Sequence, residues 1–111
     1  MDDRYDLVVL GGGAAGLVGA QVAAGLGARM VLVEPAEQPG GDCLHTGCVP
    51  SKSLLAAAQR AHDVRTADVF GVSSTEPDVD FSAVMAHVRR AIVRAGERDT
   101  PERLARRSAL A

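Results

Sequence analysis

The chain has 111 residues and a net charge of −2, with 47% hydrophobic and 23% charged residues. This length allows at most one small domain with a modest core. No apolar run approaches the ~20 residues that cross a bilayer, and the acidic amino terminus is neither a secretory signal nor a transit peptide. We therefore expect a cytoplasmic protein that binds no membrane. Because acidic residues interleave the arginines between Arg89 and Arg107, we also expect no nucleic-acid binding.

The first 34 residues have the pattern of a strand, a helix and a second strand. Residues 5–10 (YDLVVL) are apolar, rich in β-formers and bounded by glycine, which predicts a buried strand. Residues 14–26 are small and apolar, as in a helix packed closely on a sheet, and Gly27 is placed to end that helix. Residues 29–34 (RMVLVE) predict the second strand. A βαβ unit of this length implies a parallel sheet with a right-handed crossover, so the expected fold class is α/β and Rossmann-like.

The remainder of the chain predicts helices joined by a loop. Residues 63–79 have a mixed, loop-like composition. Asp80 or Ser82 is placed to cap the next helix, and T-P-E at residues 100–102 predicts the cap and first turn of a last one. One face of the helix after residue 80 carries apolar side chains, namely Phe81, Val84, Met85, Val88 and Ile92.

Three glycines form the pattern G-x-G-x-x-G between the first strand and the first helix. Gly11 suits a tight turn, Gly13 lets a pyrophosphate approach the backbone, and Gly16 lets helix and strand pack closely. Glu34 ends the second strand, where an acid accepts hydrogen bonds from ribose hydroxyls and disfavours the 2′-phosphate of NADP. The pattern predicts a dinucleotide site and does not separate FAD from NAD. The alternative is a tight turn without a ligand.

The two cysteines of the chain, Cys43 and Cys48, lie five positions apart. On an undistorted helix this spacing corresponds to a rise of ~7.5 Å, whereas a disulfide tolerates a Cα separation of roughly 7 Å. However, Gly47 and Pro50 interrupt the helix predicted over residues 42–62. Glycine tolerates unusual dihedral angles and proline lacks an N–H, so the chain can distort enough for the two thiols to be bridged.

A redox disulfide is the favoured use of this pair. A bridge that closes four intervening residues removes little chain entropy, so it is a poor structural staple. A zinc site would need more soft ligands than Cys43, His45 and Cys48, which are also too closely spaced for tetrahedral geometry. A metal site and a pair of inert thiols stay open as alternatives. Lys52 lies one helical turn beyond Cys48, where its ammonium would stabilise a thiolate or a reduced, anionic cofactor.

GGGAAG, the strand-ending Glu34 and GGDCLHTGCVPSK together resemble the N-terminal FAD domain of the class I pyridine nucleotide–disulfide oxidoreductases. The C-x4-C-V-P-S-K form is most similar to mercuric reductase-like members, followed by dihydrolipoamide dehydrogenase-like members. The segments ADVFGV and VDFSAVMAHVRRAI add to the resemblance, which covers roughly residues 4–104. Residues 1–111 are thus expected to form the N-terminal part of an FAD-binding domain.

The resemblance implies FAD as the cofactor. It implies that Cys48 is the charge-transfer thiol beside the flavin and that Cys43 is the interchange thiol that meets the substrate. Electrons would pass from NAD(P)H to FAD, then to the Cys43–Cys48 pair, and finally to a disulfide or Hg(II). The positions implied to contact FAD are Gly11, Gly13, Ala14, Ala15, Gly16, Glu34, Gly41, Asp42, Cys48 and Lys52.

The chain departs from the family in two respects. Better-known members carry threonine where this chain has Asp42, and a carboxylate there would repel the pyrophosphate unless it turns away. His45 replaces a small or amide-bearing residue and is expected to be exposed. The family enzymes are homodimers of several hundred residues, with an NAD(P)H domain and with a dimerisation domain that supplies a His–Glu pair to the partner subunit's disulfide.

These further domains are absent from the 111 residues, so we expect an incomplete domain that is inactive alone: a truncated product, a fragment or half of a split protein. The alternative function is that of a non-catalytic remnant that binds a nucleotide or a thiol, and whose sheet has exposed edges.

Overall fold

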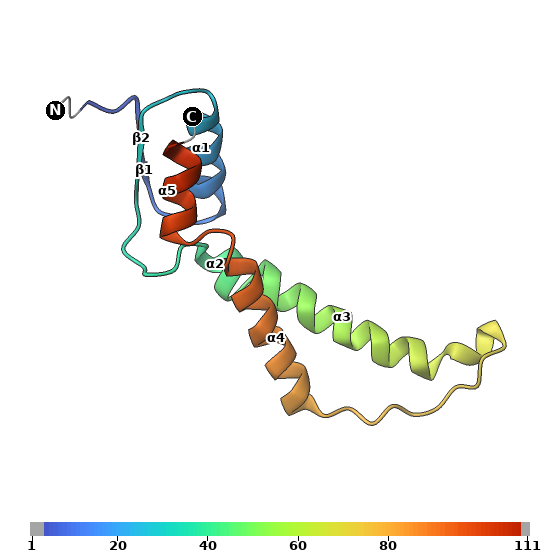
Figure 1. Ribbon diagram of the computed structural model, residues 1–111. Coiled ribbons are helices and arrows are strands. Elements are labelled where there is room, and N and C mark those ends of the chain that lie inside the picture. Colours follow the sequence, from blue (N-terminus) through green and yellow to red (C-terminus); the bar gives the residue numbers. More distant parts are fainter. Residues whose placement is uncertain (1–3, 110–111) are drawn as a thin grey trace.

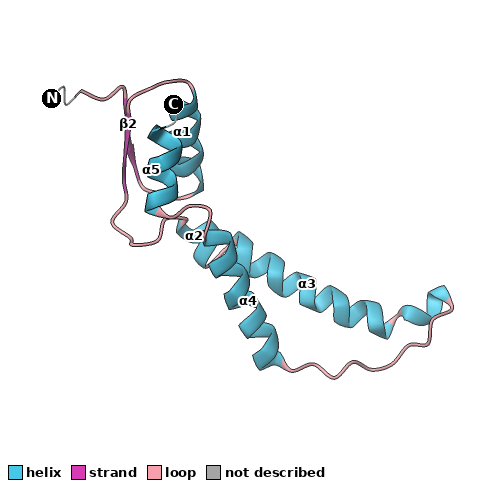
Figure 2. Cartoon of the chain, in the orientation of Figure 1, coloured by secondary structure: helices cyan, strands magenta, loops and turns pink. Residues whose placement is uncertain are grey.

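The computed structural model describes residues 4–109, and the acidic residues Asp2 and Asp3 lie outside this range. The fold is a small parallel sheet with helices, as Figure 2 shows. In chain order the elements are β1 (Leu7–Leu10), α1 (Ala14–Gly25), β2 (Met30–Val33), α2 (Gly41–His45), α3 (Cys48–Arg65), the short 3-10 helix η1 (Ala67–Phe70), α4 (Phe81–Gly96) and α5 (Pro101–Ala109).

The first three elements form the predicted βαβ unit. β1 and β2 pair in parallel, with Leu7 opposite Met30 and Leu10 opposite Val33. One side of α1 packs against this sheet and buries Leu17, Ala20 and Ala24, each at most 6% exposed. The small side chains of α1 permit this close approach, and α5 lies next to α1 (Figure 1). The α/β, partial Rossmann-like fold class is confirmed.

The expectation that the strands are buried is wrong. In β1, Leu7, Val8 and Leu10 are 36%, 55% and 80% exposed, and Val33 at the end of β2 is 50% exposed. The described residues form a sheet of only two strands, and α1 covers a single face of it. Apolar strands of this kind are typical of parallel sheets that are covered on both faces.

The helix predicted over residues 42–62 is two helices, α2 and α3, separated by Thr46 and Gly47. Pro50 does not distort it, because Pro50 is the third residue of α3, where no intrahelical N–H is required. The first donor of α3 is the Ser51 N–H, which bonds the Gly47 carbonyl at 3.0 Å.

The predicted caps of the later helices are present. The Asp80 carboxylate accepts from the Ala83 N–H at 3.1 Å at the start of α4, and the Thr100 hydroxyl accepts from the Arg103 N–H at 3.4 Å at the start of α5. On the predicted apolar face of α4, Val88 is buried at 3% exposed. Phe81, at the beginning of that helix, is 64% exposed.

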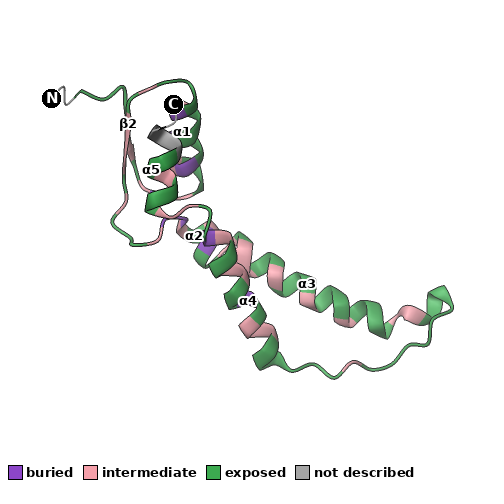
Figure 3. Cartoon of the chain, in the orientation of Figure 1, coloured by how far each residue is buried: buried purple, intermediate pink, exposed green. Residues whose placement is uncertain are grey.

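Helices α3 and α4 project away from the sheet (Figure 1). The radius of gyration is consequently 20.0 Å, against about 13 Å for a compact domain of this size. Figure 3 shows that the buried residues lie along α1 and near α2, while most of the two projecting helices is exposed. Within residues 4–109, no helix is both long and apolar enough to cross a membrane.

Candidate functional site

The glycine-rich turn between β1 and α1 is built from close backbone contacts. Gly11 has φ +98°, in the region that favours glycine. A Cβ on Gly16 would lie 1.9 Å from the Gly11 carbonyl oxygen and 3.3 Å from Val9 Cγ1, so the helix can pack here only without a side chain. A Cβ on Gly13 would meet no atom within 4 Å, which leaves open space at the amino end of α1.

The first turn of α1 faces that space. Its N–H groups have no partners within the helix, and the dipole of the helix makes this end positive. Ala14 and Ala15 are exposed and carry no bulk that would cover these groups. The turn therefore offers backbone donors to an anion, and it is the part of the structure best suited to phosphate.

Glu34, which follows β2, is tied to this turn. Its carboxylate accepts hydrogen bonds from the Gly12 N–H and from the Ala36 N–H, the latter at 2.8 Å. These two bonds, that of Ala36 first, lower the pKa of Glu34 below its ordinary value of 4.5. A Cβ on Gly12 would lie 2.9 Å from a Glu34 carboxylate oxygen, so this contact also needs a glycine. Each oxygen keeps a further lone pair for a ligand hydroxyl.

We expect Glu34→Gln to lower the urea midpoint of unfolding at pH 7, because the amide group places a donor opposite one of the two backbone N–H groups. Because the pKa of Glu34 is lower in the folded chain than in the unfolded chain, its ionised carboxylate stabilises the fold above pH 4.5. This stabilisation is lost as the pH falls through the folded-state pKa. The deficit of the variant should therefore shrink in acid. Urea titrations at pH 7 and about pH 3 measure it. Glu37→Gln, an exposed change in the same loop, is the control, and an equal deficit in both variants would contradict the prediction.

A direct backbone contact joins the glycine turn to the segment that carries the cysteines. The Gly40 N–H donates to the Gly12 carbonyl at 2.7 Å. A Cβ on Gly41 would lie 2.9 Å from Gly13 Cα, so the start of α2 contacts the amino end of α1 without side chains between them. The two sequence motifs, some 30 positions apart, therefore form one site.

Cys43 and Cys48 are brought together by the break between α2 and α3. The Thr46 and Gly47 N–H groups both donate to the Asp42 carbonyl, at 3.0 and 2.6 Å, which closes a tight turn. Both cysteines are free thiols; Cys43 is half-buried in α2 and Cys48 is exposed as the first residue of α3. The positive end of α3 therefore lies at Cys48, a position that favours negative charge.

The two thiols contact each other. The pKa of Cys43 is raised, chiefly because its thiol hydrogen-bonds to Cys48, and partial burial and the nearby Cys48 sulfur act in the same direction. A hydrogen bond from the Cys48 backbone N–H opposes this rise in the pKa, and the Lys52 ammonium opposes it more weakly. The arrangement is that of a reduced dithiol whose sulfurs lie within reach of each other.

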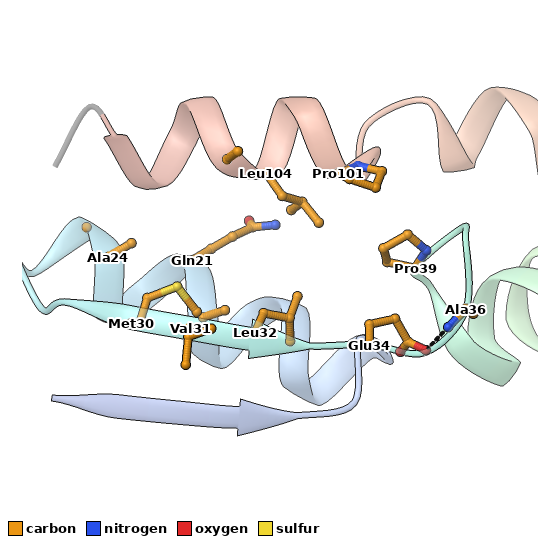
Figure 4. A pocket seen from close by; sticks show the side chains of 13 residues that line it. Gln21, Ala24, Met30, Val31, Leu32, Glu34, Ala36, Pro39, Pro101 and Leu104 are labelled. Carbon is orange, nitrogen blue, oxygen red and sulfur yellow. Dashed lines mark hydrogen bonds between the residues drawn. The ribbon is translucent and has the colours of Figure 1, made fainter. Parts of the chain in front are cut away.

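A cavity of about 550 Å³ lies between α1, β2 and α5, and Glu34 stands at one end of it (Figure 4). Its volume falls within the roughly 300–1,000 Å³ of ligand pockets. Leu32 of β2 and Leu104 of α5 line it, and Gln21 of α1 contributes an amide. We call it the β2 cavity. It offers an apolar surface next to a carboxylate.

A second cavity, of about 500 Å³, lies beside the cysteines. Cys43 lines it and Cys48 does not. Its other walls come from the start of α1 (Ala14, Leu17), from residues 40–49 (Gly40, Leu44, Val49) and from α4 and the residues after it (Ala91, Arg94, Ala95, Arg98, Asp99). We call it the Cys43 cavity. It gives an outside molecule a place from which to approach the Cys43 sulfur.

The predicted site residues thus fall into connected groups. The glycine turn, Glu34 and Gly41 are in contact, and Lys52 lies near the thiols. Asp42 is exposed. His45 is exposed, as expected, with Nε2 3.3 Å from the Gln38 carbonyl oxygen. Residues 4–109 contain no group of three or more histidine, cysteine or acidic side chains arranged to hold a metal.

Sequence reasoning missed four residues of this site: Gly12, Gly40, Arg94 and Arg98. The run of three glycines around Gly12 and the glycine pair at residues 40–41 are a usable signal, since a glycine beside a motif glycine lets the backbone make a second close contact. The arginines carried no such signal, because their approach to Cys43 depends on how α4 packs.

Comparison with known proteins places these features in a family. Residues 5–102 match the family model described as pyridine nucleotide-disulphide oxidoreductase. Dihydrolipoyl dehydrogenase of Zymomonas mobilis is 43% identical over 94 residues, which are 85% of this chain and 20% of that protein. Dihydrolipoyl dehydrogenase of Bacillus subtilis is 46% identical over 84 residues, 76% of this chain and 18% of that protein.

Mercuric reductase of Streptomyces lividans is 43% identical over 83 residues, which are 74% of this chain and 17% of that protein. The chain therefore spans about a fifth of the length of the curated relatives that it matches.

Proposed function

Since the chain belongs to the pyridine nucleotide-disulphide oxidoreductase family, we propose that it binds FAD and carries the redox-active cysteine pair of a flavin-dependent disulfide oxidoreductase. The observation that carries this proposal is the hydrogen bond from Gly40 to Gly12, which holds the cysteine segment against the glycine turn. A phosphate binder and a dithiol in contact with each other are what a disulfide-reducing flavoprotein requires.

The chain's residues fit the cofactor. The open space at Gly13 and the exposed first turn at Ala14 and Ala15 would accept the pyrophosphate. Glu34 would accept from the adenosine ribose hydroxyls, and the apolar wall of the β2 cavity would contact the adenine. Asp42 is exposed, and turning its carboxylate toward solvent would avoid repulsion from the phosphates.

At the other end of the site, Cys48 and Lys52 would lie toward the flavin ring. When bound, FAD supplies reversible two-electron chemistry between a nicotinamide and the cysteine pair. The role of this chain's residues is to present the two sulfurs. Cys43, which lines a cavity, exchanges with the substrate, and Cys48 closes the disulfide.

Membership of the family supports a proposal for the substrate, the electron donor and the assembly. We propose NAD(P)H as the electron donor, a disulfide or Hg(II) as the acceptor, and a homodimer as the assembly of the whole enzyme. Residues 1–111 would then supply the N-terminal part of its FAD domain.

A Gly13→Val substitution tests the cofactor site. We expect it to weaken FAD binding by at least about tenfold, roughly 1.4 kcal/mol, because the branched side chain would occupy the space proposed for phosphate. The fold should persist, because a Cβ on Gly13 meets no protein atom. Titration of the chain with FAD, followed by flavin fluorescence, gives the affinity, and circular dichroism reports the fold.

Gly19→Val is the matched control, since Gly19 lies on the exposed side of the same helix and its Cβ position is equally open. Equal flavin affinity in the Gly13 variant and the unsubstituted chain would refute the assignment.

The exposed apolar strands favour a second candidate, a non-catalytic nucleotide- or thiol-binding module. The absorbance spectrum of the purified chain separates the two. Flavin bands support the oxidoreductase, whereas their absence, even after addition of FAD, supports the second candidate.

A further inference from the structure

The Cys43 cavity is flanked by two arginines that the proposed cofactor site does not use. Arg94 is in the last turn of α4, and Arg98 follows four positions later, just beyond the end of the helix. Both side chains are exposed, and both residues line the cavity together with Cys43. The cavity thus brings two arginines and a cysteine to the same space.

The charge of this cavity is opposite to that of the whole chain. Asp99 also lines it, so Arg94 and Arg98 leave an excess of one positive charge there. The chain as a whole carries −2. Without a local effect, an anionic molecule would be repelled by the protein, so a preference for anions at Cys43 would have to come from the cavity itself.

We propose that the Cys43 cavity binds a disulfide or dithiol substrate that carries a carboxylate or phosphate, and that Arg94 and Arg98 hold this anionic group. Guanidinium groups match the geometry of carboxylate and phosphate oxygens and hold them bidentately. This inference rests on the proposed function, because it names the substrate class of the exchanging thiol. Apolar residues of the same cavity, such as Leu17 and Val49, would contact the carbon chain between the anion and the sulfur.

The exchange step balances without a cofactor. The Cys43 thiolate attacks one sulfur of the substrate disulfide, forming a mixed disulfide and releasing one substrate thiolate. The Cys48 thiolate then attacks the Cys43 sulfur, closing the Cys43–Cys48 disulfide and releasing the second substrate thiolate. The dithiol is oxidised by two electrons and the substrate is reduced by two. The protons lost by the cysteines go to solvent or to the released thiolates.

The test is the rate at which the reduced 111-residue chain, without flavin, is oxidised by two small disulfides. Dithiodipropionate is anionic and cystamine is cationic, and the two are similar in length. We expect the chain to prefer the anionic probe and Arg94→Gln/Arg98→Gln to lower the ratio of the two rates by about tenfold, the lower end of electrostatic focusing. Added salt should lower the ratio in the unsubstituted chain. Mass spectrometry of quenched samples measures the rates.

Arg89→Gln/Arg90→Gln is the matched control, since it removes the same charge from the exposed part of α4 outside the cavity. This variant should keep the preference. An equal ratio in all three proteins, or a preference for cystamine, overturns the inference.

A parallel FAD titration tests the other possible anion, the cofactor's own pyrophosphate, since Ala14 also lines the cavity. Weaker flavin binding by the Arg94/Arg98 variant with an unchanged probe ratio would overturn the inference in favour of the cofactor. Because the exchange needs no flavin, the probe ratio is measurable even if the chain binds no FAD, so failure of the proposed function and failure of this inference are distinguishable.

Discussion

Gly16→Ala should destabilise the fold by about 1–3 kcal/mol, the cost of forcing extra atoms into a closely packed site. The new Cβ would lie 1.9 Å from the Gly11 carbonyl oxygen, so α1 would have to move away from β1 or the turn would have to change its dihedral angles. At about 4–8 °C per kcal/mol for a domain of this size, the thermal midpoint should fall by several degrees or more. Thermal unfolding followed by circular dichroism measures the effect.

The same substitution at Gly19 is the control. Gly19 lies three positions further along α1, and a Cβ there would meet no atom within 4 Å. Alanine is favoured over glycine in a helix interior by about 1 kcal/mol, so Gly19→Ala should raise the midpoint or leave it unchanged. If the thermal midpoint falls in the Gly16 variant and rises in the Gly19 variant, the packing at Gly16, and not helix propensity, is the cause of the destabilisation. A Gly16 variant as stable as the unsubstituted chain would mean that α1 does not pack against the glycine turn.

Local patterns predicted the βαβ unit because its determinants lie close together in the sequence. Apolar strands, small helix residues and the glycines at positions 11 and 16 act within about 30 residues, and each imposes one conformation. The helix starts at Asp80 and Thr100 are predictable for the same reason, because each capping side chain accepts from an N–H only three positions later. The sequence predicts the break at Gly47. It also predicts a distortion at Pro50, which is absent because Pro50 lies in the first turn of α3, and no local pattern reports where that helix starts.

What the sequence did not predict depends on contacts between distant segments. The exposure of β1 is decided by what covers the sheet, which no periodicity within β1 reports. The contact of Gly40 with Gly12 and the approach of Arg94 to the Cys43 cavity join positions about 30 and 50 residues apart. Motifs therefore located the glycine-rich turn and the thiols, whereas the charge around the thiols became evident only from the packing of α4.

Bound FAD should protect one of the two thiols, Cys48, from alkylation and leave the other, Cys43, reactive. Both cysteines are free thiols, Cys48 exposed and Cys43 half-buried. In the chain without flavin, iodoacetamide should therefore alkylate both of them. With FAD bound, Cys48 should be protected from alkylation. Cys43 should continue to react, because it lines the Cys43 cavity and Cys48 does not. The rate at Cys43 should rise with pH above neutrality, because the thiolate is the nucleophile and the pKa of the Cys43 thiol is raised. Peptide mass spectrometry with and without FAD measures the modification at each position.

Single serine variants complete the test in the presence of FAD. Cys48→Ser retains the exchanging thiol but not the resolving one, so dithiodipropionate should leave a stable mixed disulfide on Cys43 and release one thiol instead of two. Cys43→Ser should react at least about tenfold more slowly, since its remaining thiol is covered. The unsubstituted chain should form the Cys43–Cys48 disulfide, and a mild reductant should open it. If Cys48 alkylates equally with and without FAD, or if Cys43→Ser accumulates the mixed disulfide faster than Cys48→Ser does, then Cys48 is the exchanging thiol and the assigned order is wrong.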